Sequence, residues 1–143
     1  MEKINEKSNV ITWFEVPVMD TARAKKFYET IFDIKMQTHT VVIKDFISKG
    51  EMTEEMTFFP SLAGVTQATS GRVTGALVKS ERFKSSTEGT LIYFNAYPDI
   101  QMIIDKIEPA GGKIIAPKFK MLAGYIAIFV DTEGNKMALH AEA

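Results

Sequence analysis

Hydrophobic and polar positions alternate along the sequence ITWFEVPV, at residues 11–18, which is rich in β-branched and aromatic residues. This period of two predicts a β-strand with one buried face. The period then lengthens to three or four, with charged residues between the apolar ones, at Ala24, Phe27, Tyr28 and Ile31. Asp20 precedes this run and is a favourable N-cap, so we expect a helix from about Thr21 to Phe32.

The same order of patterns occurs twice in the chain. Strand-like segments follow the first helix at residues 35–44, 55–59 and 73–78. WFEVPVMD at Trp13 then has a near copy, YFNAYPD, at Tyr93, followed by a second helical pattern and three more strand-like segments. One such β-α-β-β-β unit leaves an apolar face open that its twin can cover. We therefore predict a mixed α+β fold of two βαβββ modules, whose eight strands form a curved, incomplete barrel with the helices outside.

Polar segments indicate the boundaries of these modules. We expect a disordered tail at residues 1–10, a first module at 11–79, a linker at 80–89 and a second module at 90–143, all within one compact domain. The segment SLAGVTQATSG, at residues 61–71, has small polar residues that bury little surface. It is predicted to be a mobile loop and is a candidate lid.

Composition excludes several classes of function. The 143 residues are 45% hydrophobic, enough for one domain with a core. Lys and Arg number 17 against 18 Asp and Glu, without a basic stripe, so we expect no nucleic-acid partner. Cysteine is absent, which excludes disulfides and thiolate metal sites. With no long apolar run either, we expect a cytoplasmic protein without a membrane partner.

Three segments carry a family resemblance: FEVPVMDTARAKKFYETIF, IEPAGGKIIAPK and VDTEGNKMALH. Together they resemble the vicinal oxygen chelate superfamily, which includes glyoxalase I, bleomycin-resistance proteins, fosfomycin-modifying enzymes and extradiol dioxygenases. The resemblance covers nearly the whole chain apart from the tail. It implies the duplicated βαβββ fold and, because modules of this family pair within or between chains, a homodimer. Isomerases, transferases, oxygenases and binding proteins share this fold, so the resemblance does not select an activity.

In metal-using members of the superfamily, the first and last strand of each module supply His, Glu or Gln ligands to a divalent cation. Counting back seven residues from Asp20 puts the first of these positions at Trp13. Counting four residues beyond Gly134 puts another at Ala138. An indole and a methyl group cannot ligate a metal in these roles.

The other two ligand positions follow from internal symmetry. GALV aligned on MALH gives Ala76, and YFN aligned on WFE gives Tyr93, or Ile92 if the count runs back from Asp99. We favour Tyr93. None of these side chains completes a coordination shell, so we predict no metal and no cofactor.

Candidate chemistry lies on the predicted cavity face. Strand alternation puts Glu15 beside Trp13, and His140 on the face of Ala138. Among aromatic side chains Glu15 would lose part of its hydration, which makes it a candidate general base. Equally, hydrogen bonds could satisfy its carboxylate, or it could lie at a module or subunit contact. We therefore take Glu15 and His140 as candidate catalytic residues, and as ligand-binding residues Trp13, Tyr93 and Tyr125.

Two functions fit these residues. The first is a metal-free protein that binds a small organic molecule in the cavity of the duplicated half-barrel. The alternative is a superfamily enzyme, of lyase, isomerase or dioxygenase type, that acts on a small carbonyl compound with Glu15 as base or with a metal held by unexpected residues. A third possibility is an interaction module whose own side chains fill the cavity.

Overall fold

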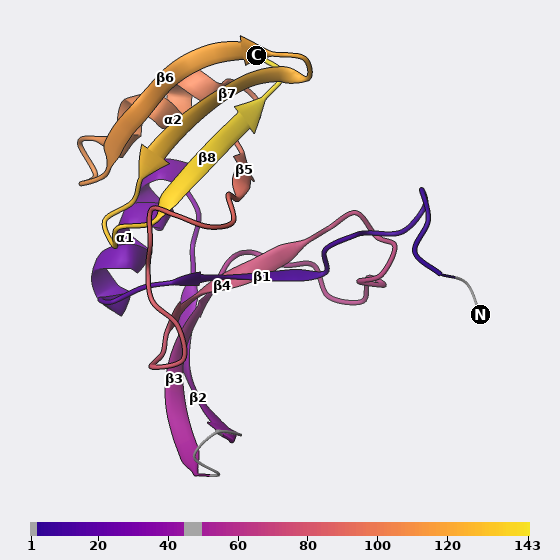
Figure 1. Cartoon of the computed structure of the whole chain (residues 1–143), viewed down its shortest axis with the longest axis vertical. Helices are drawn as coiled ribbons and strands as arrows, with labels where there is room; N and C mark the ends of the chain where they lie inside the picture. The colour runs from indigo at the N-terminus through magenta and orange to yellow at the C-terminus, as the bar shows by residue number, and fades with distance from the viewer. Residues whose placement is uncertain (1–2, 45–49) are drawn as a thin grey trace.

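A computed structural model of the chain describes residues 3–44 and 50–143 (Figure 1). Residues 1 and 2, part of the predicted tail, lie outside the described residues. The elements follow the order predicted from the repeat. They are β1 (Trp13–Pro17), α1 (Thr21–Phe32), β2 (Gln37–Lys44), β3 (Glu51–Phe58), β4 (Thr74–Lys79), β5 (Tyr93–Asn95), α2 (Ile100–Ile107), β6 (Lys113–Met121), β7 (Gly124–Val130) and β8 (Lys136–Ala141).

The eight strands form two four-stranded sheets with the same internal order. The first sheet runs β1-β4-β3-β2 and the second runs β5-β8-β7-β6. In each, the first strand of the module pairs parallel with its last strand and the other pairs are antiparallel. The predicted fold of two βαβββ modules is confirmed. The two sheets do not close on each other, as expected for an incomplete barrel (Figure 1).

An aspartate caps the start of each helix, and α1 begins where the sequence predicts. The Asp20 carboxylate accepts a hydrogen bond from the backbone N–H of Arg23 at 3.0 Å, and Asp99 accepts one from Gln101 at 2.9 Å. These caps satisfy backbone donors that have no partner within the helix. The apolar side of each helix is buried: Ala24, Phe27, Tyr28 and Ile31 in α1, and Ile100, Ile103, Ile104 and Ile107 in α2.

A single core joins the two modules. The helices contact each other, and strand residues of both sheets, among them Val16, Leu77 and Leu139, belong to the same buried cluster. Phe14 of β1 also packs edge-on to Phe94 of β5, with ring centroids 6.0 Å apart. Since side chains alternate along a strand, each sheet turns its other face away from this core. We call these the first open face, which carries Trp13, Glu15 and Phe58, and the second open face, which carries Tyr93, Asn95 and His140.

The turn between β7 and β8 ties the second module to the first through buried polar side chains, here called the inter-module network: Asp131, Glu133 and Asn135. The hydroxyl of Tyr28, in α1, donates to Asp131 at 2.6 Å, and Nδ2 of Asn135 donates to the carbonyl oxygen of Pro17 at 2.7 Å. Glu133 accepts hydrogen bonds at the start of α1. Because these partners belong to opposite modules, the network fixes how the modules sit together.

The loop at residues 61–71 contacts the N-terminal segment. The backbone N–H of Asn9 donates to Ala68 at 2.7 Å, its side chain donates to Gln67 at 2.7 Å, and Gly71 donates back to Asn9 at 3.0 Å. In Figure 1 both segments lie beyond the same end of β1 and β4. The loop is thus tied to the tail rather than to the ladder of the sheet, and its mobility stays a prediction.

Candidate functional site

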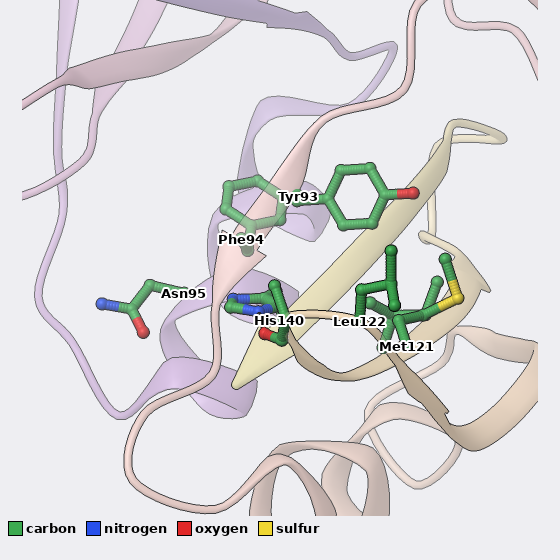
Figure 2. Close-up of a pocket in the computed structure, with 8 residues that line it drawn as sticks. Tyr93, Phe94, Asn95, Met121, Leu122 and His140 are labelled. Carbon is green, nitrogen blue, oxygen red and sulfur yellow. Dashed lines mark hydrogen bonds between the residues drawn. The ribbon is translucent and has the colours of Figure 1, made fainter. Parts of the chain in front are cut away.

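The second open face has a cavity of about 460 Å³ (Figure 2). Strand register builds its floor, since Asn95 pairs with His140, and His140 pairs with Ile126 on the other side. Side chains directly opposite each other in a sheet share one face. The turn between β6 and β7 supplies one wall. The lining residues are Tyr93, Phe94, Asn95, Met121, Leu122, Ala123, Ile126 and His140.

The cavity is mainly apolar, with a few polar groups in fixed positions. His140 donates a hydrogen bond through Nε2 to the carbonyl oxygen of Ala123, which joins β8 to the β6–β7 turn. The side-chain oxygen of Asn95 accepts from the backbone N–H of Tyr97 at 2.9 Å. Figure 2 shows His140 between β5 and the turn that carries Leu122. Apolar walls with a few oriented polar groups are the usual composition of a small-molecule pocket.

Of the five site residues predicted from the sequence, the structure brings Tyr93 and His140 together in this cavity. Trp13 and Glu15 lie side by side on β1, on the first open face, and Nε1 of Trp13 donates to Glu15 at 3.2 Å. They line a separate groove of about 420 Å³ along β1. The two pairs thus occupy the open faces of different modules.

Tyr125 lies apart from both pairs. Its neighbour Ile126 points into the cavity, so strand alternation turns Tyr125 to the opposite face of β7. There it packs against the buried core, with the ammonium group of Lys118 4.3 Å from its ring centroid. Tyr125 does not line the cavity that contains Tyr93 and His140.

Sequence reasoning missed two exposed apolar residues, Met121 at the end of β6 and Leu122 in the turn that follows. Their signal is that two large apolar side chains occur next to a turn, where they have no core to enter. It also missed Arg82, which contacts Glu15 on the first open face, and Glu54, which pairs with Arg82. An acidic residue among the apolar residues of one strand face is the signal for that pair.

The positions that carry metal ligands in metal-using relatives do not fit a metal here. Ala76 and Ala138 are fully buried methyl groups, and Trp13 and Tyr93 offer an indole and a phenol. Within residues 3–44 and 50–143, no group of three or more His, Cys, Asp or Glu side chains is arranged to hold a metal ion. This donor set matches neither the nitrogen nor the oxygen ligands that divalent ions prefer. Within the described residues, no helix has both the length and the apolar character needed to span a membrane.

Comparison with known proteins supports the resemblance seen in the sequence. The model of the Glyoxalase/Bleomycin resistance protein/Dioxygenase superfamily matches residues 10–139. No curated protein matches the chain.

Several solved structures have a similar fold. A glyoxalase/bleomycin resistance protein from Albidiferax ferrireducens T118 has a TM-score of 0.64 at 18% identity, over 94% of this chain and 100% of its own. A glyoxalase family protein from Bacillus cereus has a TM-score of 0.64 at 10% identity, over 97% and 98%. A fosfomycin resistance protein from Listeria monocytogenes has a TM-score of 0.58 at 14% identity, over 94% of each chain. At these identities the likeness concerns the fold alone.

Proposed function

Because the chain belongs to the Glyoxalase/Bleomycin resistance protein/Dioxygenase superfamily, we propose that it binds a small organic molecule on the open faces of its half-barrels, without a metal ion. The observation that carries this proposal is the cavity of about 460 Å³ on the second open face. Its size suits a small ligand, and Tyr93 and His140 can orient that ligand within apolar walls. Trp13 and Glu15 form the ligand-binding surface on the first open face. Tyr125 packs on the core-facing side of β7 and so holds that strand in place.

The side chains at the four family ligand positions support a metal-free mode of binding. Metal binding in proteins draws its energy from deprotonated ligands, and two methyl groups, an indole and a phenol supply none. Ligand affinity in this protein then comes from apolar burial and a few hydrogen bonds.

An indole placed in the cavity should weaken this binding. Ala123→Trp puts the added ring at the exposed β6–β7 turn, on the wall of the cavity. We expect the affinity for the dye 1-anilinonaphthalene-8-sulfonate, followed by its fluorescence, to fall at least about tenfold, since the ring occupies the apolar volume. Ala22→Trp, on the exposed side of α1, adds the same ring elsewhere and should leave the affinity unchanged. Equal affinities for both variants and the unmodified protein would show that the dye does not use this cavity.

A second function is favoured by the surroundings of Glu15. Its carboxylate is half-buried between Trp13 and Arg82, which hold it from both sides. A fixed carboxylate can take a proton from the carbon next to a carbonyl group. The guanidinium beside it can stabilise the negative charge that develops on the carbonyl oxygen. The alternative is therefore an enzyme of lyase, isomerase or dioxygenase type acting on a small carbonyl compound, with Glu15 as base and His140 as a second proton-transferring group.

The protein is also proposed to be a cytoplasmic homodimer. Each open face is half of a barrel, and both expose large apolar side chains, including Trp13, Tyr93 and Leu122. A second copy can cover such faces symmetrically. The absence of cysteine suits a reducing compartment.

Sedimentation measures this assembly directly. At micromolar concentration we expect a single species with twice the 16.0 kDa mass of one chain. Leu122→Glu, which puts a charge on a fully exposed apolar side chain of the second open face, should shift that species toward the monomer. A monomer of 16.0 kDa in the unmodified protein would contradict the proposal.

A further inference from the structure

A glutamate is buried on the first open face. Glu54 lies in β3, and by strand alternation it shares the face of Met56 and Phe58, away from the helices. Only 2% of its surface is exposed. Carboxylates are almost never buried to this extent unless a partner compensates the charge.

The partner is Arg82, from the segment that follows β4. Its Nε donates to one oxygen of Glu54 at 2.6 Å and its Nη2 donates to the other at 3.2 Å. The guanidinium also lies 5.2 Å from the ring centroid of Phe83. The hydrogen bonds from Arg82 hold the pKa of Glu54 below its ordinary value, so both groups are charged at neutral pH. A bidentate pair of this kind fixes the orientation of the guanidinium.

The outer edge of this guanidinium faces Glu15 and solvent. Nη2 lies 3.6 Å from Oε1 of Glu15, and Oε2 of Glu15 accepts from the indole N–H of Trp13 at 3.2 Å. The Arg82 side chain is 44% exposed. In the part of the chain that the structure describes, no acceptor binds its Nη1 group. A donor edge and a carboxylate acceptor are thus presented side by side.

An apolar wall adjoins this pair. The rings of Trp13 and Phe58 have centroids 6.1 Å apart. Both line a cavity of about 290 Å³, whose other side is formed by residues of the loop at 61–71. A planar ligand packed against these rings can place a polar group at Glu15, because the Trp13 indole itself reaches that carboxylate.

The charges on this face select the polar group. Glu54 already neutralises Arg82, and Glu15 adds one further negative charge. An anion that approaches Arg82 is repelled by the negative charge of Glu15, and a cation that approaches Glu15 is repelled by the positive charge of Arg82. A neutral group with a donor next to an acceptor satisfies both partners at once.

We infer that the Arg82–Glu15 pair binds a neutral carboxamide or hydroxycarbonyl group of a planar ligand. Arg82 donates to the carbonyl oxygen, and Glu15 accepts from the neighbouring N–H or O–H. Glu54 is a positioning residue that acts by holding Arg82. This inference rests on the proposed small-molecule function and names the ligand chemistry that the first open face recognises.

Three probes of one shape test the preference: benzamide is neutral, benzoate is an anion and benzamidine is a cation. Trp13 is the only tryptophan in the chain, so quenching of its fluorescence reports binding at this face. We expect benzamide to bind about tenfold more tightly than either ion, because only benzamide pairs with both Arg82 and Glu15.

Variants separate the roles of the two charged partners. Arg82→Gln should weaken benzamide binding about tenfold, whereas Lys26→Gln, which removes a positive charge from the exposed side of α1, should leave it unchanged. Glu54→Gln removes one of the two negative charges beside Arg82, so benzoate should gain affinity relative to benzamide. A purely structural role for Glu54 would weaken all three probes equally. Thermal unfolding of each variant checks that it is folded, and if Glu54→Gln is not, the comparison of Arg82→Gln with Lys26→Gln decides.

Several results would overturn the inference: tightest binding by benzamidine or benzoate, an effect of Lys26→Gln in place of Arg82→Gln, or no saturable quenching by any probe. The dye experiment at Ala123 reports the second open face independently. If the dye binds as expected while benzamide shows no preference, the inference fails and the proposed function stands.

Discussion

Asp131→Ala should lower the free energy of unfolding by about 3–5 kcal/mol. Asp131 is buried and accepts four hydrogen bonds, from the Tyr28 hydroxyl, the backbone N–H of Glu133, and both the backbone and the side chain of Asn135. Its removal leaves these buried donors without an acceptor. Burial, together with the Asp131 carboxylate, raises the pKa of Tyr28 well above its ordinary value, so the phenol stays protonated and needs that acceptor.

Urea denaturation at neutral pH measures the loss, with an unchanged dependence on urea as evidence that the unfolded state is unaffected. Tyr28→Phe removes one of the four donors and should cost about 1–2 kcal/mol. The double variant should cost less than the sum of the two single changes, since both remove the same hydrogen bond. A loss below about 1 kcal/mol for Asp131→Ala would mean that water replaces the carboxylate, and that the inter-module network does not hold the modules together.

The fold was accessible from the sequence because its signals are local. The α1 helix runs from Thr21 to Phe32 as expected, since one cap residue and one apolar stripe define it. The repeat of WFE as YFN places β1 and β5 in equivalent positions, at the edge of each sheet beside the last strand of the module. The order of elements therefore follows from periodicity alone.

The extent of β3 was harder to predict. The sequence indicates a strand at residues 55–59, whereas β3 runs from Glu51 to Phe58. Glu54 lies on the same face of β3 as Met52 and Met56 and interrupts the apolar alternation, so the strand pattern becomes recognisable only after it. Its partner Arg82 lies 28 residues further along the chain, and no local pattern connects the two.

The grouping of the site residues also lay beyond sequence reasoning. Alternation correctly puts Trp13 with Glu15, and Tyr93 pairs with Ala138 two positions before His140. It does not determine how one module packs on the other. In the structure the helices pack between the modules, so the two open faces point away from the shared core. Tyr125 shows the same limit within a strand, since the register of β7 against β8 decides which face it takes.

Glu133→Gln should lower stability at neutral pH by about 2–4 kcal/mol, and should remove part of the acid sensitivity of the protein. The Glu133 side chain is fully buried, and its oxygens accept from the backbone N–H groups of Met19 and Asp20 at 2.8 Å and from Arg23 at 2.7 and 3.1 Å. Glutamine keeps the shape but loses the charge, and its amide group turns a donor toward donors.

The pH dependence follows from the direction of the pKa shift. Burial alone would raise the pKa of Glu133, but the hydrogen bonds from Arg23, Asp20, Met19 and Thr132 outweigh it, and the pKa lies below its ordinary value of 4.5. The unfolded chain therefore binds the proton more readily than the folded one. The stabilisation is complete above pH 4.5 and is lost as the pH falls through the folded-state pKa. Urea denaturation between neutral pH and pH 3 should accordingly show the difference between Glu133→Gln and the unmodified protein shrinking on the acid side. Glu88→Gln, at an exposed position, should have the stability of the unmodified protein at every pH. If the stability of Glu133→Gln instead falls with pH in parallel with that of the unmodified protein, the Glu133 carboxylate does not contribute to acid unfolding.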